Sequence, residues 1–260
     1  MKIGIIQGRL SEPIEGFQEC PKNWKKDFEL LNKLKLNHIE WIVTKKSFDN
    51  NPIFTENLSN YPISSICADN LVDSNTTARY TNVIFLKKNL KPICDVAVKN
   101  NIKCITIPLL EESSVLDDSR RSFFIEEISK YKEMYPNLIF SFEIESYEYV
   151  IDEIINICDN FKLTYDTGNM TSLGINHEYY IEKYINKINN IHLKDRTYTS
   201  KTVSPGKGKT NFNEIFNTLN LKKYKGLYTI QTSRGEFGKE KQTIKKHKEK
   251  FKKLYDEKFI

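Results

Sequence analysis

The chain has 260 residues, 39% of them hydrophobic and 12% aromatic, which is enough for one full core. The net charge of +6 slightly favours an anionic small molecule and is too weak to indicate a nucleic-acid-binding protein by itself. The five cysteines include no Cys-x-x-Cys pair, and most lie in apolar runs. We therefore expect buried free thiols in a reducing cytoplasm rather than disulfides or a zinc knuckle. The N-terminus turns polar too early for a signal peptide, and no apolar run approaches the ~20 residues of a membrane span.

Short apolar runs typical of strands buried on both faces recur along the chain. They cover residues 2–7, 38–43, 62–68, 104–109, 138–144, 161–166, 189–194 and 226–232. The alternation of these runs with helix-like stretches predicts an α/β fold with a parallel sheet. Eight such units favour a closed (β/α)8 TIM barrel, as a single domain over residues 1–260, rather than an open sheet. A dinucleotide-binding fold is disfavoured because no Gly-x-Gly-x-x-Gly follows the first run.

The stretches between the runs have apolar residues at helical spacing. We expect a helix capped by Asn23, a helical stretch over 79–100 that Pro92 divides or kinks, and a helix over 120–135 capped by Ser119. Further helices are expected over 146–159, 177–187, 211–220 and 239–257, with only a short helix in the connection 44–61. The last helix is dense in lysine, and its interspersed acidic residues favour a solvated outer helix over a nucleic-acid patch.

Four polar residues lie at or near the ends of the last four runs: Glu143, Asp166, His192 and Gln231. In a TIM barrel the strand ends gather at one face, where the active site lies. Two carboxylates, an imidazole and an amide oxygen could together hold one divalent cation. Structural roles are the alternatives: a lysine-paired Glu143, a turn-forming Asp166 or a core His192. Of the other histidines, His38 begins the second run, and we expect His177 and His247 on helix surfaces.

A basic cluster follows the seventh and eighth runs and comprises Lys194, Arg196, Lys201, Lys207, Lys209 and Arg234. Loops at these places often form the phosphate site of a TIM barrel, and the backbone amides of Gly206 and Gly208 would suit an anion. The alternative is an ordinary glycine turn with solvated lysines. At the ends of the first three runs, side chains could reach the hydroxyls of a substrate; these are Gln7, Arg9, Glu40 and Asp69.

Motifs along nearly the whole chain resemble those of the sugar phosphate isomerase/epimerase branch of the xylose-isomerase-like barrels. They are Ile3-Gly-Ile-Ile-Gln7-Gly8-Arg9-Leu10, His38-Ile-Glu40-Trp41, Ser65-Ile-Cys-Ala-Asp69, Ile107-Pro108-Leu, Phe142-Glu143-Ile, Tyr165-Asp166-Thr-Gly168-Asn169, Ile191-His192-Leu-Lys194-Asp195-Arg196 and Gly206-Lys-Gly208. The resemblance implies one Mn²⁺, Mg²⁺, Zn²⁺ or Co²⁺ ion held by Glu, Asp, His and Glu on the last four strands. Here these positions carry Glu143, Asp166, His192 and, in place of the second glutamate, Gln231.

The resemblance further implies a metal-dependent isomerase or epimerase that moves a proton next to the carbonyl of a small, polyhydroxylated, anionic sugar or sugar phosphate. Its catalytic residues would be Glu143 and Lys194, and its substrate-binding residues Gln7, Arg9, Glu40, Asp69, Lys194, Arg196 and Arg234. Because the amide of Gln231 cannot accept a proton, a two-base epimerisation is disfavoured, whereas an aldose–ketose isomerisation needs only Glu143. We expect a cytoplasmic protein without nucleic-acid or membrane partners and leave a homodimer open.

Three other functions are weighed against this one. A lyase, such as a dehydratase of a keto-polyol, would use the same metal and base but expel water. A non-catalytic sugar-binding barrel is permitted by the glutamine at position 231. A DNA-repair phosphodiesterase like endonuclease IV is disfavoured, because its three-metal cluster needs many histidines and this chain has four.

Overall fold

The eight apolar runs form parallel strands joined in one closed barrel. A computed structural model of the chain describes residues 1–13, 18–72 and 83–258. The barrel strands are β1 (Lys2–Ile6), β2 (Ile39–Ile42), β3 (Ile63–Cys67), β4 (Cys104–Leu109), β5 (Ile139–Ile144), β6 (Phe161–Asp166), β7 (Ile188–Leu193) and β10 (Leu227–Ile230). Their hydrogen-bonding order is β1-β10-β7-β6-β5-β4-β3-β2. The predicted (β/α)8 TIM barrel is confirmed, and each strand lies within its predicted range or one residue beyond it.

Helices occupy the connections as predicted, with one further short helix directly after β6. They are α1 (Trp24–Lys33), α2 (Val83–Asn89), α3 (Lys91–Lys99), α4 (Asp118–Met134), α5 (Glu148–Ile155), α6 (Thr167–Ser172), α7 (His177–Tyr184), α8 (Phe212–Leu221) and α9 (Glu240–Asp256). Short 3-10 helices cover Phe48–Asn50, Pro52–Phe54, Asp69–Leu71 and Glu111–Ser113. No helix within the described ranges is long and apolar enough to cross a membrane. Residues 79–82 of the predicted helix 79–100 lie outside the described residues.

The helix boundaries depend on a few local residues. Pro92 lies in the first turn of α3, so it begins a new helix, where its missing N–H costs nothing. Asn23 occupies the N-cap position of α1 without a side-chain capping bond. The predicted cap Ser119 is wrong: Asp117 caps α4 by accepting a hydrogen bond from the backbone N–H of Arg120 at 2.9 Å. The hydroxyl of Ser119 donates to the same carboxylate at 2.5 Å.

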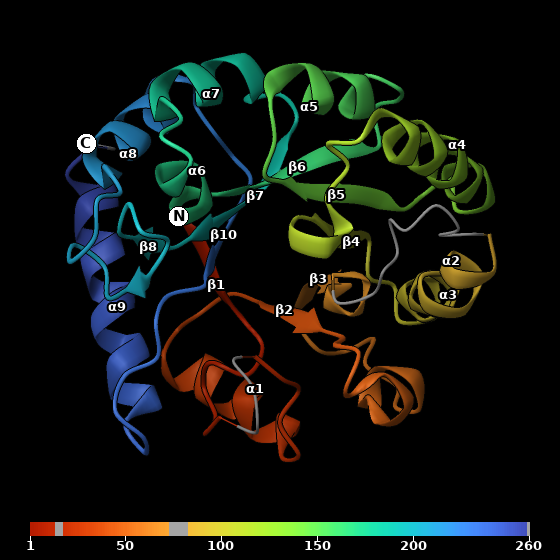
Figure 1. Ribbon diagram of the computed structural model, residues 1–260. Coiled ribbons are helices and arrows are strands. Elements are labelled where there is room, and N and C mark those ends of the chain that lie inside the picture. Colours follow the sequence, from red (N-terminus) through yellow and green to blue (C-terminus); the bar gives the residue numbers. More distant parts are fainter. Residues whose placement is uncertain (14–17, 73–82, 259–260) are drawn as a thin grey trace. The chain divides into compact units, whose positions relative to one another are not determined.

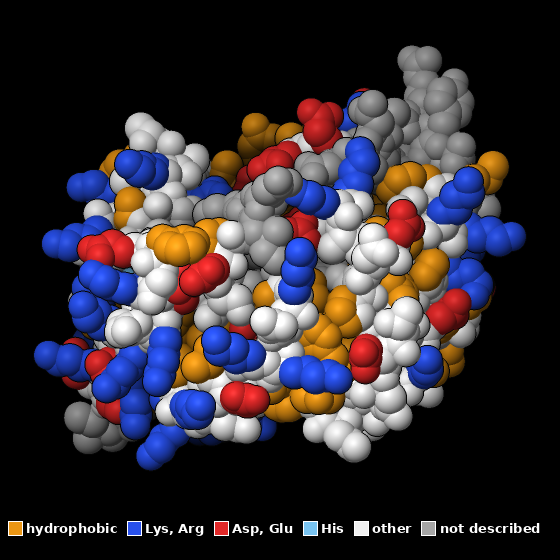
Figure 2. All heavy atoms as spheres, turned by 90° about the horizontal axis from the view of Figure 1, so that it is seen from below, with side chains coloured by type: hydrophobic (Ala, Val, Ile, Leu, Met, Phe, Trp, Pro, Cys, Tyr) orange, Lys and Arg blue, Asp and Glu red, His pale blue; other side chains and the backbone are white. Residues whose placement is uncertain are grey.

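Contacts between Cα atoms divide the chain into two compact units, one of residues Met1–Ile39 and Tyr165–Ile260 and the other of Glu40–Thr164. In the first unit, α7 packs on α8 and α8 packs on α9 (Figure 1). The short helix α6 lies beside strand β8 (Asp195–Arg196). Strand β8 pairs in antiparallel fashion with β9 (Thr202–Val203). Helix α9 buries Ile244 and Phe251, as predicted for an outer helix. Figure 2 shows Lys and Arg side chains over the displayed face with Asp and Glu side chains between them.

In the second unit, α2 and α3 pack together, and α3 also contacts β4 (Figure 1). Aromatic rings fill the space on the outer side of its strands, with Phe161 edge-on to Phe140 at 6.2 Å and to Phe142 at 5.2 Å between ring centroids. Of the five free cysteines, Cys67, Cys94 and Cys104 are buried, as expected, whereas Cys20 and Cys158 are partly exposed.

A layer of buried polar residues lies along the inner face of the strands. The hydroxyls of Ser141 and Thr164 are hydrogen-bonded at 2.7 Å, and Thr229 donates to the side chain of Asn190 at 2.9 Å. Because side chains alternate along a strand, the residue two positions later on each strand shares this face. Those four residues are Glu143, Asp166, His192 and Gln231. The polar layer therefore directs all four candidate ligands to the inner face.

Candidate metal centre

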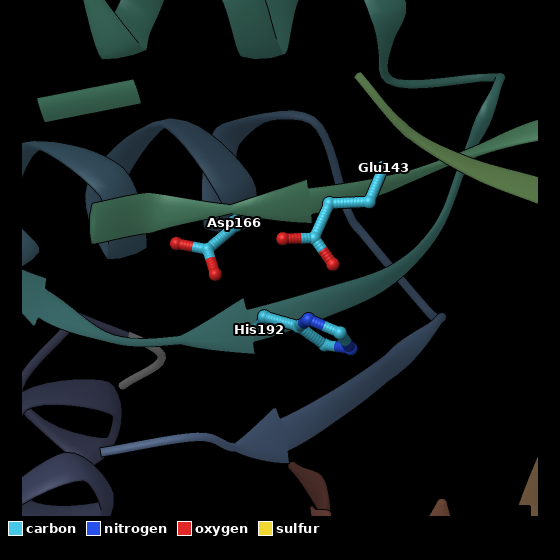
Figure 3. A group of neighbouring side chains, drawn as sticks. All are labelled: Glu143, Asp166 and His192. Atoms are coloured by element: carbon cyan, nitrogen blue, oxygen red, sulfur yellow. The ribbon is translucent and has the colours of Figure 1, made fainter. Parts of the chain in front are cut away.

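Glu143, Asp166 and His192 form a group of neighbouring donor atoms at the ends of β5, β6 and β7. One ligand atom from each lies within 4.8 Å of the others. All three side chains are buried, with exposed fractions of 6%, 1% and 0%. Figure 3 shows the two carboxylates and the imidazole turned toward one another. Two carboxylates and an imidazole are a donor set that divalent ions such as Zn²⁺ and Mn²⁺ accept.

Asp166 also begins a helix that the sequence did not predict. One carboxylate oxygen, Oδ1, accepts hydrogen bonds from the backbone N–H groups of Gly168 and Asn169, both at 2.8 Å, and so caps α6. This capping holds the carboxylate in one orientation at the strand end. The other oxygen, Oδ2, accepts a hydrogen bond from the ammonium of Lys194 at 2.8 Å.

Lys194 is held along α6 by several contacts and has an exposed fraction of only 5%. Its ammonium also donates to the side-chain oxygen of Asn169 at 3.3 Å, and its backbone N–H donates to the hydroxyl of Thr167 at 3.0 Å. A Cβ atom at Gly168 would lie 2.8 Å from Cγ of Lys194. The glycine of the Asp-Thr-Gly-Asn motif therefore leaves the space in which the lysine side chain reaches Asp166.

The surroundings of Asp166 keep its carboxylate charged. Burial would raise the pKa of this carboxyl, because the interior disfavours the charged form. The positive charge of Lys194, the nearby His192 and the hydrogen bonds from Lys194 and Asn169 outweigh burial and hold the pKa below its usual value. The charged form is the one that binds a cation.

Gln231 follows β10 and continues its pairing with β7. Its backbone N–H donates to the carbonyl of Leu193 at 3.1 Å, and Thr229 is in register with His192. Its side-chain oxygen Oε1 is buried and has no hydrogen-bond partner within the described part of the chain. A buried amide oxygen without a donor is costly and suits a cation ligand. The donor atoms at the four predicted positions are therefore of the kinds that a divalent cation binds.

The glycine loop after β7 differs from the expectation that its backbone amides face an anion. The fully buried carboxylate of Asp195 accepts hydrogen bonds from the N–H groups of Gly206 at 2.7 Å, Gly208 at 3.0 Å and Thr210 at 3.1 Å. A Cβ atom at Gly208 would lie 2.2 Å from this carboxylate. The amides therefore fold the loop onto Asp195, which the sequence reasoning did not single out, and the alternative of an ordinary glycine turn is correct for them.

The basic residues of the predicted anion cluster are spread over different environments. The side chains of Lys201, Lys207 and Lys209 are exposed. Arg234 donates to two carbonyls of the loop after β1, that of Ser11 at 3.1 Å and that of Gly8 at 2.5 Å. It therefore fixes the loop that carries Arg9, and a role in substrate binding for Arg234 stays a prediction.

Gln7 and Arg9 are buried directly after β1, with exposed fractions of 1% and 2%. Burial and the charge of Arg234 lower the pKa of the Arg9 guanidinium to about 9. Glu40 lies inside β2 with no exposed surface and accepts a hydrogen bond from Thr106 at 2.5 Å. Asp69 begins a 3-10 helix and is half-buried. Substrate contacts of these four residues and of the half-buried Arg196 also stay predictions.

Two histidines expected on helix surfaces are buried, so that prediction is wrong. His177 is 6% exposed and His247 is 7% exposed. His177 lies between the hydroxyl of Tyr165, which contacts Nδ1, and the hydroxyl of Thr171, 3.0 Å from Nε2. Burial lowers the pKa of His177 to about 4, so the ring is neutral at pH 7.

Comparisons with known proteins agree with the fold. The profile of a family described as "Xylose isomerase-like TIM barrel" matches residues 85–254. No curated protein matches the chain by sequence. Among solved structures, an IOLI protein with a binding zinc atom is 17% identical with a TM-score of 0.76, and the match covers 100% of this chain and 99% of that one.

Two further structures share the fold. The 3-keto-D-glucoside 4-epimerase YcjR from E. coli is 16% identical with a TM-score of 0.70, over 97% of this chain and 99% of that one. A sugar phosphate isomerase/epimerase from Parabacteroides distasonis is 14% identical with a TM-score of 0.65, over 94% of this chain and 91% of that one.

Proposed function

Because the chain belongs to the xylose isomerase-like TIM-barrel family, we propose that it is a divalent-cation-dependent isomerase of a small sugar or sugar phosphate. The observation that carries the proposal is the buried group of Glu143, Asp166 and His192, whose ligand atoms lie within 4.8 Å of one another. The zinc atom of the IOLI protein and the sugar epimerases of the same fold support it.

The protein contributes four side chains that would hold the cation. Asp166 and Glu143 supply carboxylate oxygens, His192 a ring nitrogen and Gln231 an amide oxygen. A divalent ion at this place would polarise the oxygens of a hydroxy-carbonyl compound and so acidify the neighbouring C–H bond. The hydrogen bonds that Gly168 and Asn169 give to Asp166 fix one of the ligands before any ion arrives.

Glu143 is the residue that moves the proton. The group has two carboxylates, Glu143 and Asp166. The carboxylate of Asp166 already accepts hydrogen bonds from two backbone amides and one ammonium, which leaves Glu143 as the base. Gln231 cannot act as a second base from the opposite side, because an amide has no accessible proton equilibrium. The set therefore favours a one-base aldose–ketose isomerisation over a two-base epimerisation. Lys194 is the second catalytic residue in this proposal, and its ammonium would donate a hydrogen bond to a substrate oxygen.

The test is a screen of aldoses, ketoses and their phosphates in D2O with added Mn²⁺, Mg²⁺, Zn²⁺ or Co²⁺. We expect isomerisation with deuterium at the carbon next to the carbonyl. Glu143→Gln should reduce turnover by roughly 10²–10⁴-fold, as for the loss of a general base. The control Glu148→Gln changes an exposed glutamate on α5 and should leave turnover unchanged.

Two results would contradict the proposal. A product lighter by one water would show a lyase instead, since isomerisation conserves mass. Undiminished exchange in Glu143→Gln would show that another group carries the proton.

A further inference from the structure

The positive charge of Lys194 lies next to the carboxylate of Asp166, which would bind the cation. Its ammonium lies 2.8 Å from Oδ2 of Asp166, and both side chains are nearly inaccessible, with exposed fractions of 6% and 1%. Coulomb interactions inside a protein are stronger than in water, because few mobile water dipoles screen them. A cation that binds Asp166 therefore comes within a few ångströms of a buried ammonium of the same sign.

The lysine is not needed to orient the carboxylate. Oδ1 of Asp166 accepts two backbone hydrogen bonds at 2.8 Å, and these belong to the first turn of α6. A carboxylate with one oxygen held by two amides keeps its direction when the partner of the other oxygen is removed. The usual role of a second residue behind a metal ligand, which is to fix the ligand, is thus already filled by the backbone.

The fold nevertheless keeps the ammonium at this place. Asn169 gives it a second acceptor at 3.3 Å, Gly168 leaves room for its side chain, and Thr167 binds the backbone of Lys194 on both sides, at 3.0 Å to the N–H and 2.7 Å to the carbonyl. The side chain cannot turn away without losing these partners. Its charge is a fixed part of the centre.

We propose that Lys194 weakens divalent-cation binding at this centre by competing for the carboxylate of Asp166, so that removal of its charge tightens binding. The proposal rests on the proposed cation site. Together with Gln231, an uncharged residue where the resemblance implies a glutamate, it makes this a centre that binds its cation weakly and reversibly. The positive charge that Lys194 contributes is then available to an anionic oxygen of the substrate.

Isothermal titration with Mn²⁺, without substrate, tests the proposal. Lys194→Met and Lys194→Gln should each bind Mn²⁺ at least about tenfold more tightly than the wild type, since one buried like charge is removed. Lys207→Met, which removes an exposed lysine of the neighbouring loop, should leave the dissociation constant unchanged. Two different neutral residues guard against a variant that misfolds, and circular dichroism checks both.

The outcomes separate the two claims. If Lys194→Met and Lys194→Gln bind about 10–100-fold more weakly than the wild type, Lys194 supports the ligand instead, and the inference is overturned. Equal affinity in all four proteins overturns it as well. If neither the wild type nor the Lys194 variants bind Mn²⁺, Zn²⁺, Mg²⁺ or Co²⁺, the proposed cation site itself fails.

Discussion

His177 should make the stability of this protein depend on pH, through a buried ring that stays neutral. The ring contacts the hydroxyls of Tyr165 and Thr171 and is 6% exposed. Because the phenol of Tyr165 has a pKa raised well above its usual value by burial, it keeps its proton and donates to Nδ1. A second proton on the imidazole, at Nδ1, would take up the lone pair that accepts this hydrogen bond.

The size of the effect follows from the two pKa values. The pKa of His177 is lowered by burial from 6.5 to about 4 in the folded protein, so the unfolded chain binds more protons between these values. Stability from this group is complete above about pH 6.5 and is lost as the pH falls toward 4. The difference between the two pKa values corresponds to about 3 kcal/mol of unfolding free energy.

Urea denaturation at pH 7.5 and pH 4.5 measures this, with His177→Gln as the variant that cannot titrate. Other groups shift over the same range, because burial also lowers the pKa of His247 to about 4 and raises that of Asp27 to about 6. Comparing the wild type with the variant removes their contributions. The stability advantage of the wild type should shrink by about 2–3 kcal/mol at the lower pH. An advantage that is the same at both pH values would refute the reasoning.

Three further substitutions have defined outcomes. Asp195→Ala removes the acceptor of three loop amides and should cost about 3 kcal/mol in urea denaturation, with Asp195→Asn intermediate; a loss below about 1 kcal/mol would contradict this role. Gly168→Ala should displace Lys194 from Asp166 and cost about 1–2 kcal/mol, and a crystal structure with the ion pair intact would disprove it. Gln231→Glu adds a charge and should tighten Mn²⁺ binding roughly tenfold by calorimetry; unchanged affinity would place residue 231 outside the cation site.

The barrel could be predicted from the sequence because its signals are local. Strands buried on both faces read as continuous apolar runs, and Pro92, which has no N–H to donate inside a helix, marks the start of α3. The candidate ligands could also be proposed from the sequence, because each follows a small polar residue by two positions, as in Ser141-x-Glu143 and Thr164-x-Asp166. That spacing places a polar layer and a ligand layer on one face of the barrel.

The features that could not be predicted are contacts between residues that are not neighbours in the sequence. Asp195 accepts three hydrogen bonds from the backbone of residues 206–210. Without this acceptor, the glycine loop has the sequence pattern of an anion site. His177 and His247 lie on helices whose pattern looked amphipathic. Their partners, Tyr165 and Thr232, come from other elements. A histidine in a helix gives no local sign of which face will be covered.

The measurement that tests the central claim most directly is calorimetric titration of the purified chain with Mn²⁺ and Zn²⁺. We expect one ion per chain in the wild type and a loss of affinity of more than about 100-fold in Asp166→Ala and His192→Ala, with melting temperatures that show folded protein. Glu236→Ala, which removes an exposed carboxylate, should bind as the wild type does. Equal stoichiometry and affinity in the wild type and in both ligand variants would contradict the account.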